Sequence, residues 1–290
     1  MPVRTYQEYP STPALQLPAL SCDSHVHVFG PVSRFPYAAN RRATPLEAPK
    51  EALFALHRQL GIERCVIVQS ITHGTDNSAV EDAIAAGQGR YLGVALVSPE
   101  VPDAELLRLA EAGFRGVRFN FMRHIAGSAS VEQVLALTPR LAAVGMHLQV
   151  HFESELVHEL SAPLKRSQVP VVIDHMGRVD ATKGVSHEDF QALLQLLEHR
   201  LFHVKVSGID RIDANAPAAL RYRNGVALAR TIVQRHPERC VWGTDWPHPN
   251  HTHIPDDAVL VEAISEITDG GVRLEQLMVH NPQNLYRFSA

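Results

Sequence analysis

Histidine and aspartate side chains stand in short patterned groups along this chain of 290 residues, and they are the groups best suited to chemistry. His25 and His27 are two residues apart, and His175 directly follows an aspartate farther along the chain. A carboxylate such as that of Asp245 can deprotonate a water molecule. The histidines can donate hydrogen bonds to a carbonyl oxygen as it becomes an oxyanion. Together these groups indicate hydrolysis at a polarised carbonyl.

Arginines accompany the same segments and indicate an anionic substrate. Arg118, Arg178 and Arg211 each present a planar guanidinium group of the kind that pairs with carboxylates. Asn120 and His151 add polar side chains at the ends of two neighbouring apolar segments. We therefore expect a small anionic substrate that binds beside the histidines.

The same residue types can also bind a metal ion. A His-x-His pair followed by a later histidine and an aspartate offers nitrogen and oxygen ligands suited to Zn²⁺ or Mn²⁺. Residue types alone do not distinguish a metal centre from a set of hydrogen-bond donors, so both interpretations stay open at this point.

Eight short apolar segments alternate with longer amphipathic ones. The predicted strands cover residues 19–29, 64–70, 91–97, 116–121, 146–152, 169–175, 201–208 and 239–245. Helical periodicity is clearest in residues 49–61, 102–113, 131–145 and 192–200. Strand segments that are apolar throughout are typical of a parallel sheet covered by helices. The pattern predicts an α/β protein with a single (β/α)8 TIM barrel over residues 19–290, preceded by a Pro-rich arm of residues 1–18.

The barrel prediction gives the polar groups a common location. The active site of such a barrel lies at the carboxyl ends of its strands. Residues two apart on a strand share a face, so we expect His25 and His27 both to point into the mouth. Histidines in helical patterns are expected at the surface, namely His57, His158, His187, His199 and His236. Four further histidines lie in predicted loops, where exposure to solvent accounts for them as well as a functional role does: His73, His248, His251 and His253.

Composition excludes several classes of protein. The net charge of -4, without runs of like charge, argues against a nucleic-acid-binding or polybasic membrane-binding surface. Three cysteines without a CxxC pair are typical of a reducing compartment. The first twenty residues lack the apolar core of a signal peptide, and no run approaches membrane-spanning length, so a cytoplasmic protein is expected. Dinucleotide-binding, P-loop and serine-hydrolase motifs are absent from the sequence. Oligomeric state and the location of the arm are left open.

A set of ordered motifs resembles a known family. The segments are HVHVFGPVSRFP, CVIVQSITHGTDN, GVRFNF, VVIDHMGR, DRID, WGTDWPHPN, IPDD and NPQNLY, and they span residues 25–286. They resemble the amidohydrolase-2 branch of the amidohydrolase superfamily, and within it the 2-pyrone-4,6-dicarboxylate hydrolases. The resemblance implies a distorted barrel and a lactonase that opens a carboxylated six-membered lactone in the catabolism of aromatic, lignin-derived compounds.

The resemblance also implies roles for individual residues. Asp245 matches the base that activates water and then returns the proton to the leaving enol oxygen. His25, His27 and His175 match the groups that polarise the lactone carbonyl. The candidate substrate-binding residues are Arg118, Asn120, Arg123, His124, His151, Arg178, Arg211, His248 and Asn250. Lactonases of this family work without a divalent metal, so no cofactor is expected.

Four pocket positions depart from the family pattern. His124 stands where the family has a second arginine, with Arg123 beside it, and His151 replaces a tyrosine. Ala43 and Ile71 replace a tyrosine and a serine. The exact lactone is therefore open. His151 also introduces a metal ligand, because with His25, His27 and Asp245 it would complete a four-residue set for an ion such as Zn²⁺.

Three alternatives remain beside the lactonase of this particular substrate. A zinc-dependent decarboxylase occurs in the same branch, and a lactonase acting on a sugar lactone or a muconolactone would use similar groups. A barrel that only binds aromatic acids is less favoured, because a binding site needs no base beside a carbonyl cradle.

Overall fold

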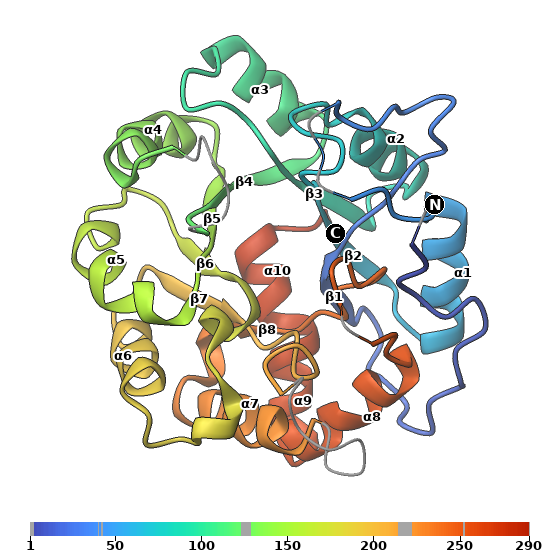
Figure 1. The fold of residues 1–290 in the computed structure, drawn as a ribbon, viewed down its shortest axis with the longest axis vertical. Coiled ribbons are helices and arrows are strands. Elements are labelled where there is room, and N and C mark those ends of the chain that lie inside the picture. Colours follow the sequence, from blue (N-terminus) through green and yellow to red (C-terminus); the bar gives the residue numbers. More distant parts are fainter. Residues whose placement is uncertain are drawn as a thin grey trace.

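The computed structural model describes residues 3–39, 41, 43–122, 129–213, 222–251 and 253–289. Eight parallel strands form one sheet in sequence order and curve into a nearly closed barrel, with helices around it (Figure 1). The strands are β1 (Cys22–Val26), β2 (Arg64–Val68), β3 (Tyr91–Ala95), β4 (Phe114–Asn120), β5 (His147–His151), β6 (Val171–Ile173), β7 (Phe202–Lys205) and β8 (Cys240–Val241). The (β/α)8 barrel predicted from the sequence is confirmed.

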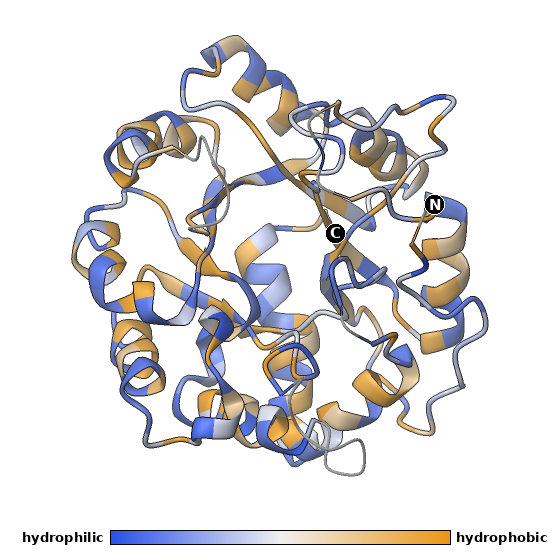
Figure 2. Cartoon of the chain, viewed as in Figure 1, coloured by the Kyte–Doolittle hydropathy of each residue, from blue (hydrophilic) through white to orange (hydrophobic). Residues whose placement is uncertain are grey.

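The helices bury apolar residues against the barrel, with the exception of the short helix at Gly271–Glu275, in which no residue is buried. They are α1 (Lys50–Leu60), α2 (Ser78–Ala86), α3 (Asp103–Glu111), α4 (Val131–Ala143), α5 (Val157–Leu164), α6 (Glu188–Leu197), α7 (Arg223–Arg235), α8 (Asp257–Thr268), α9 (Gly271–Glu275) and α10 (Asn281–Tyr286). In α3, Leu106 and Leu109 are buried, whereas Leu107 on the outer face is 51% exposed. Figure 2 shows the same mixture of hydrophilic and hydrophobic residues on the outer helices. In the part of the chain that the structure describes, no helix is long and apolar enough to cross a membrane.

The barrel closes between β1 and the segment that follows β8. Backbone hydrogen bonds join the two, from Ser24 N to Trp242 O (2.7 Å) and from Asp245 N to His25 O (2.8 Å). The register of β1 against β2 shifts between Asp23 and Val26, where β1 contains one additional residue. Such a bulge changes which side chains face the interior. His25 and His27 nevertheless both point into the barrel, as predicted, because both rings lie against Asp245.

Asp23 fixes this closure from within the wall. Its Oδ1 atom accepts hydrogen bonds from the backbone N–H groups of Thr244 and His25, both at 3.1 Å. Its Oδ2 atom accepts from the Thr244 hydroxyl at 2.6 Å. Gly243 is required beside it, because a Cβ atom there would lie 2.6 Å from the backbone nitrogen of His25. The position of His25 thus depends on a buried network between the first and last strands.

The end of the barrel opposite the carboxyl ends of the strands is filled by apolar side chains. A compact cluster fills it, formed by Cys22, Val66, Val68, Leu92, Val94, Val241, Tyr286 and Phe288. The C-terminal helix α10 supplies one of the two aromatic rings and lies in the middle of the ring of strands in Figure 1. This end is filled by side chains, whereas the described residues form a cavity at the opposite end, at the carboxyl ends of the strands.

The N-terminal arm runs along one side of the molecule and reaches the barrel mouth. Val3 forms a parallel bridge with Pro45, and both Val3 and Thr5 line the mouth. Farther along, the backbone N–H of Leu15 donates to Glu262 on α8 at 3.1 Å. The arm is therefore a wall of the entrance, a location that the sequence left open.

His57 does not lie at the surface as predicted. It is 1% exposed, and its Nδ1 atom lies 2.8 Å from the Tyr91 hydroxyl. Its Nε2 atom lies 3.6 Å from Asp23 Oδ2. The helical pattern identified the helix correctly. His57 lies on its inner face, where the side chains of Tyr91 and Asp23 surround the ring.

Replacing Asp23 with alanine tests the closure. Three donors would lose their acceptor, so we expect the free energy of unfolding to fall by about 2 to 5 kcal/mol in urea denaturation. Asp103→Ala is the control, since this 81% exposed carboxylate pairs with Arg140 at the surface. Its cost should stay below about 1 kcal/mol. Equal losses in the two variants would contradict the role given to Asp23.

Candidate active site

Asp245 lies at the centre of the barrel mouth. Its Oδ1 atom is 3.4 Å from His27 Nε2, 3.7 Å from His25 Nε2 and 3.8 Å from His175 Nε2. Its Oδ2 atom accepts a hydrogen bond of 2.5 Å from Arg211 Nη2. One carboxylate thus meets three imidazoles on one oxygen and a guanidinium on the other. The four residues that the sequence assigned to catalysis are together.

The Asp245 carboxyl is ionised although it is buried. Its side chain is 1% exposed, and burial by itself would raise its pKa. Arg211 and His175 oppose this effect, together with the neighbouring His27 and His25 rings, and hold the pKa well below its usual range. An ionised carboxylate at the base of the cavity is available to accept a proton from a water molecule.

A second buried carboxylate, that of Asp174, lies on the other side of the His25 ring from Asp245. Arg118 Nε donates to its Oδ2 atom at 2.8 Å, and His25 Nδ1 lies 3.3 Å from its Oδ1 atom. The fully buried Lys205 ammonium lies 3.7 Å from the same Oδ1 atom. Burial opposes ionisation of Asp174, but Arg118, His25 and Lys205 hold its pKa well below the ordinary value.

Lys205 was not among the predicted site residues, although it lies beneath the site. Its Nζ atom donates to Gln149 Oε1 at 2.8 Å and lies 3.3 Å from His25 Nδ1. Burial lowers the pKa of Lys205 to about 8. The available signal in the sequence was a lysine within an otherwise apolar strand, since a buried lysine needs polar partners.

Strained backbone presents two of the catalytic candidates. His175, Met176, Gly177 and Arg178 follow β6 in consecutive left-handed conformations, with φ of 48°, 52°, 62° and 53°. Asp245 has a φ of 67°. Each such non-glycine residue costs on the order of 1 to 3 kcal/mol, and such residues cluster at functional sites. The turn directs both His175 and Arg178, three residues apart, toward the cavity at the mouth.

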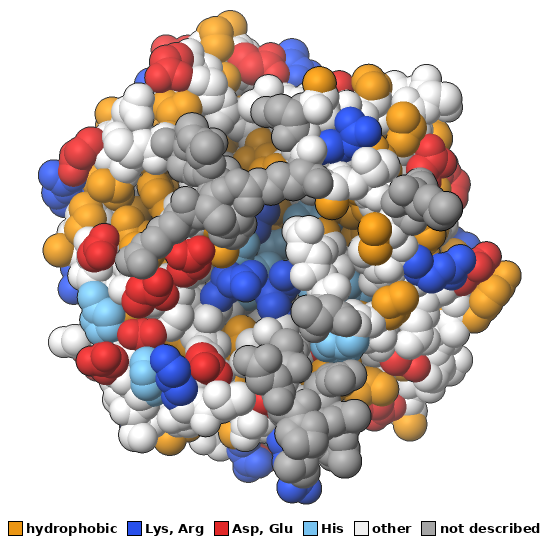
Figure 3. All heavy atoms as spheres, viewed as in Figure 1, with side chains coloured by type: hydrophobic (Ala, Val, Ile, Leu, Met, Phe, Trp, Pro, Cys, Tyr) orange, Lys and Arg blue, Asp and Glu red, His pale blue; other side chains and the backbone are white. Residues whose placement is uncertain are grey.

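The mouth contains a cavity of about 460 Å³ above these groups. Six of the predicted substrate-binding residues line it: Arg118, Asn120, His151, Arg178, Arg211 and Asn250. Ala43 and Ile71, two of the departures from the family pattern, lie on its wall. Figure 3 shows Lys, Arg and His side chains gathered in the middle of this face. Arg123 and His124 lie outside the described residues.

His248 is not placed as predicted for a substrate contact. It is fully buried, and its Nε2 atom lies 3.0 Å from Asp257 Oδ1 at the start of α8. It does not line the cavity, because the carboxylate of Asp257 holds it in the wall. His251, for which loop exposure was an equal expectation, lines the cavity instead.

The residues present also fit a divalent metal, but in a different combination from the predicted one. Ligand atoms of His25, His175 and Asp245 lie within 4.8 Å of one another. His25 Nε2 and Asp245 Oδ1 are both buried without a hydrogen-bond partner in the described structure. His151 is not in this group of mutually close ligand atoms. Its Nδ1 atom lies 3.0 Å from Asn120 Oδ1, and its Nε2 atom is buried without a hydrogen-bond partner in the described structure. The predicted set of four is therefore replaced by a set of three.

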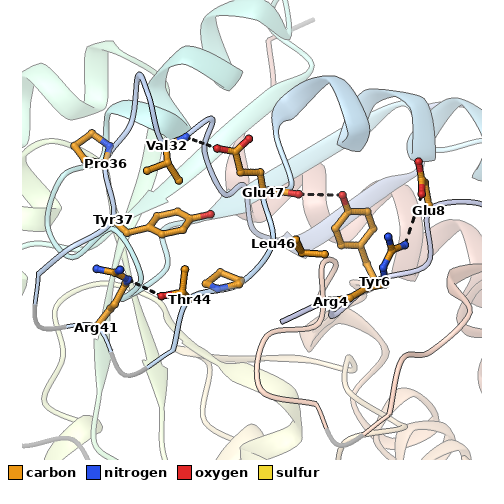
Figure 4. A pocket seen from close by; sticks show the side chains of 11 residues that line it. Arg4, Tyr6, Glu8, Val32, Pro36, Tyr37, Arg41, Thr44, Leu46 and Glu47 are labelled. Atoms are coloured by element: carbon orange, nitrogen blue, oxygen red, sulfur yellow. Dashed lines mark hydrogen bonds and ion pairs between the residues drawn. The ribbon is translucent and has the colours of Figure 1, made fainter. Parts of the chain in front are cut away.

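A second cavity lies beside the mouth and shares Arg41 and Pro45 with it. It measures about 640 Å³ and lies between the arm and the β1–α1 loop (Figure 4). Its polar groups bind each other: Tyr6 donates to the Glu47 carbonyl at 3.0 Å, and Arg4 pairs with Glu8 at 3.6 Å. The catalytic candidates do not line this cavity, so the smaller one is the candidate active site.

Comparison with known proteins agrees with this geometry. The sequence profile of the amidohydrolase family matches residues 22–288. The chain belongs to the amidohydrolase family. It is 42% identical over 284 residues to a 2-pyrone-4,6-dicarboxylate hydrolase of Comamonas testosteroni, covering 96% of this chain and 93% of that protein.

Two further relatives carry related names. A 4-sulfomuconolactone hydrolase of Hydrogenophaga intermedia is 35% identical, over 93% of this chain and 89% of its own length. A crystal structure of a probable 2-pyrone-4,6-dicarboxylic acid hydrolase from Acinetobacter baumannii, with citric acid bound, superposes with a TM-score of 0.80. It is 25% identical and covers 93% of this chain and 100% of its own. The similarity to named lactone hydrolases thus extends over nearly the whole chain.

The buried pair of Arg118 and Asp174 gives a stability test of the site. In Arg118→Met the Asp174 carboxylate would lose its closest cation, and we expect a loss of about 3 kcal/mol or more in the free energy of unfolding. Adding Asp174→Asn should restore part of that loss, because the buried charge is then gone. Arg108→Met, in an exposed pair with Glu105, is the matched control and should have little effect. A double variant less stable than Arg118→Met would refute the account of this pair.

Proposed function

We propose that this protein is a lactonase that hydrolyses 2-pyrone-4,6-dicarboxylate or a closely related carboxylated lactone. The observation that carries the proposal is the ionised Asp245 carboxylate, which is buried next to three imidazoles under an arginine-lined cavity. The similarity to named lactone hydrolases over more than nine-tenths of the chain supports the substrate class.

In the proposed reaction, Asp245 takes a proton from a water molecule as the water oxygen attacks the lactone carbonyl carbon. Hydrogen bonds from His25 and His175 stabilise the oxyanion that forms on the carbonyl oxygen. His27 adds a third donor in its doubly protonated form, because its Nδ1–H already donates to the Val68 carbonyl oxygen at 2.7 Å. The acyl carbon–oxygen bond of the ring then breaks, and Asp245 returns its proton to the leaving enol oxygen. One water is consumed, and the product carries one new carboxylate.

Arginines anchor the substrate in this proposal. Arg178 lines the cavity and has no acidic partner within 4.0 Å in the described part of the chain, so its guanidinium is available to a carboxylate. Arg211 uses Nη2 on Asp245, and its Nε atom is buried without a hydrogen-bond partner in the described structure. Asn250 lies exposed at the rim of the same cavity. Ala43 and Ile71 leave part of the wall apolar, which favours a substrate with fewer polar substituents on that side.

The charges around the site bear on whether the reaction needs a divalent metal ion. His25, His175 and Asp245 would hold a divalent ion, and such an ion would polarise the lactone carbonyl. We propose that hydrolysis does not require it, because positive charge is already supplied by Arg211, at 2.5 Å from Asp245, and by Lys205 beneath His25. A divalent cation beside them would meet like charges.

We also propose the cytoplasm as the location of the enzyme. All three cysteines, Cys22, Cys65 and Cys240, are buried free thiols, as is typical of proteins in a reducing compartment.

Replacing Asp245 with asparagine removes the proposed base and keeps the shape of the side chain. We expect the turnover number on 2-pyrone-4,6-dicarboxylate to fall by about 100-fold or more, while the substrate still binds. Loss of the pyrone absorbance measures turnover, and calorimetry measures binding. The control is Asp257→Asn, another buried aspartate that does not line the cavity. Near-normal turnover by Asp245→Asn would refute the assignment of the base.

Metal removal tests the second part of the proposal. After treatment with a chelator and dialysis, elemental analysis should show far less than one divalent ion per chain, with activity unchanged. Adding Zn²⁺ should not raise it. Activity that disappears with the metal and returns on adding zinc would show that the His25, His175 and Asp245 group is a metal centre.

A zinc-dependent decarboxylase is the second candidate, and the same His, His and Asp group favours it. Release of carbon dioxide from a panel of carboxylated pyrones and muconolactones distinguishes it from hydrolysis. Hydrolysis of a muconolactone without turnover of the pyrone would move the substrate assignment toward the 4-sulfomuconolactone hydrolase relative.

A further inference from the structure

Arg211 Nη2 contacts more acceptors than Asp245 alone. The nitrogen lies 3.0 Å from the Pro249 carbonyl oxygen and 3.1 Å from His251 Nδ1. Arginine donates hydrogen bonds and cannot accept them. His251 Nδ1 must therefore present its lone pair to Arg211, so the proton of the neutral ring is on Nε2.

The other side of the His251 ring meets a buried carboxylate. Its Nε2 atom lies 2.6 Å from Asp210 Oδ2, and Asp210 is fully buried. His253 Nε2 lies 3.8 Å from the same oxygen. Burial and the charge of Arg211 lower the pKa of His251, which keeps the ring neutral. The contact is short but is not aligned as a hydrogen bond, because His251 Nε2 and both Asp210 oxygens have no hydrogen-bond partner in the described structure. The negative charge of Asp210 beside Nε2 nevertheless favours the ring proton on that nitrogen, and Nδ1 is left free to accept.

We propose that Asp210 and His251 are positioning residues for the lactonase reaction, acting through Arg211 on the base Asp245. Asp210 fixes the tautomer of His251, His251 fixes the guanidinium of Arg211, and Arg211 fixes the Asp245 carboxylate. This proposal rests on the proposed function of the site.

The chain of contacts links substrate binding to the base. The two N–H groups of Arg211 Nη2 are shared among acceptors on Asp245, Pro249 and His251, and these contacts restrain the guanidinium when the site is empty. The Arg211 side chain also lines the cavity, where a substrate carboxylate would bind. One guanidinium then aligns the anionic substrate and the base with each other, and small displacements of such groups cost about 100-fold in rate.

A similar pair nearby provides the matched control. The His248 ring centre lies 5.1 Å from that of His251, and His248 is paired with Asp257. His248 does not line the cavity. The two pairs are therefore alike in residue type and surroundings, but only one of them contacts Arg211 among the contacts described.

Two substitutions of His251 separate its two nitrogens. His251→Asn keeps an acceptor near the position of Nδ1, whereas His251→Gln keeps a donor near the position of Nε2 and loses that acceptor. We expect kcat/KM to fall by about 100-fold in His251→Gln and by about 10-fold in His251→Asn. The double variant of His251→Gln with Arg211→Gln should be no worse than Arg211→Gln alone. His248→Gln should change stability and leave kcat/KM within about twofold.

Additive losses in the double variant, or equal losses in His251→Gln and His248→Gln, would overturn the proposal. A second readout needs no substrate: ¹⁵N NMR of the wild-type protein, with the His251 signal assigned by its loss in His251→Gln. The expected signal is a neutral ring protonated on Nε2, and Asp210→Asn should change this signal. A ring protonated on Nδ1 refutes the positioning role. If the tautomer is as expected but no lactone is hydrolysed, the proposed function fails and not the contact chain.

Discussion

A carboxylate that is buried and yet ionised is the constraint on which this structure depends. Moving a charge out of water is expensive unless it is paired and hydrogen-bonded. Asp245 meets this requirement through Arg211 and through imidazoles from β1 and from the turn after β6. Asp174 meets it through Arg118, Lys205 and His25. The two carboxylates share His25, so the site and its support form one charged network.

Two structural features position this network: strained backbone at the barrel mouth, and a barrel closure held by the polar contacts of Asp23. Left-handed residues at Asp245 and along the turn from His175 to Arg178 bring their side chains to the mouth. They are tolerated because the strands beneath them are packed on both faces. Asp23 joins the first strand to the segment after the last one, at the point where His25 enters the site. Stability and function are therefore linked at this closure.

The sequence was sufficient for the fold and for the centre of the site. Apolar runs gave all eight strands, and the spacing of His25 and His27 gave their common direction, because both follow from local periodicity. What it could not give were pairings between distant residues. His57 and His248 are buried because Tyr91 and Asp257 bind their rings, and neither contact has a signal in the local sequence. Lys205 was given no role for the same reason, because its contacts are with Asp174 and Gln149 from other parts of the chain. His151 was expected to complete a metal site, but its ligand atoms do not belong to the close group formed by His25, His175 and Asp245.

The most direct test of the central claim is the product formed when the purified, metal-free protein meets 2-pyrone-4,6-dicarboxylate. The account predicts that the pyrone absorbance disappears and that mass spectrometry finds one product, heavier than the substrate by one water and with every carbon retained. An unchanged pyrone, or a product that has lost carbon dioxide, would contradict it.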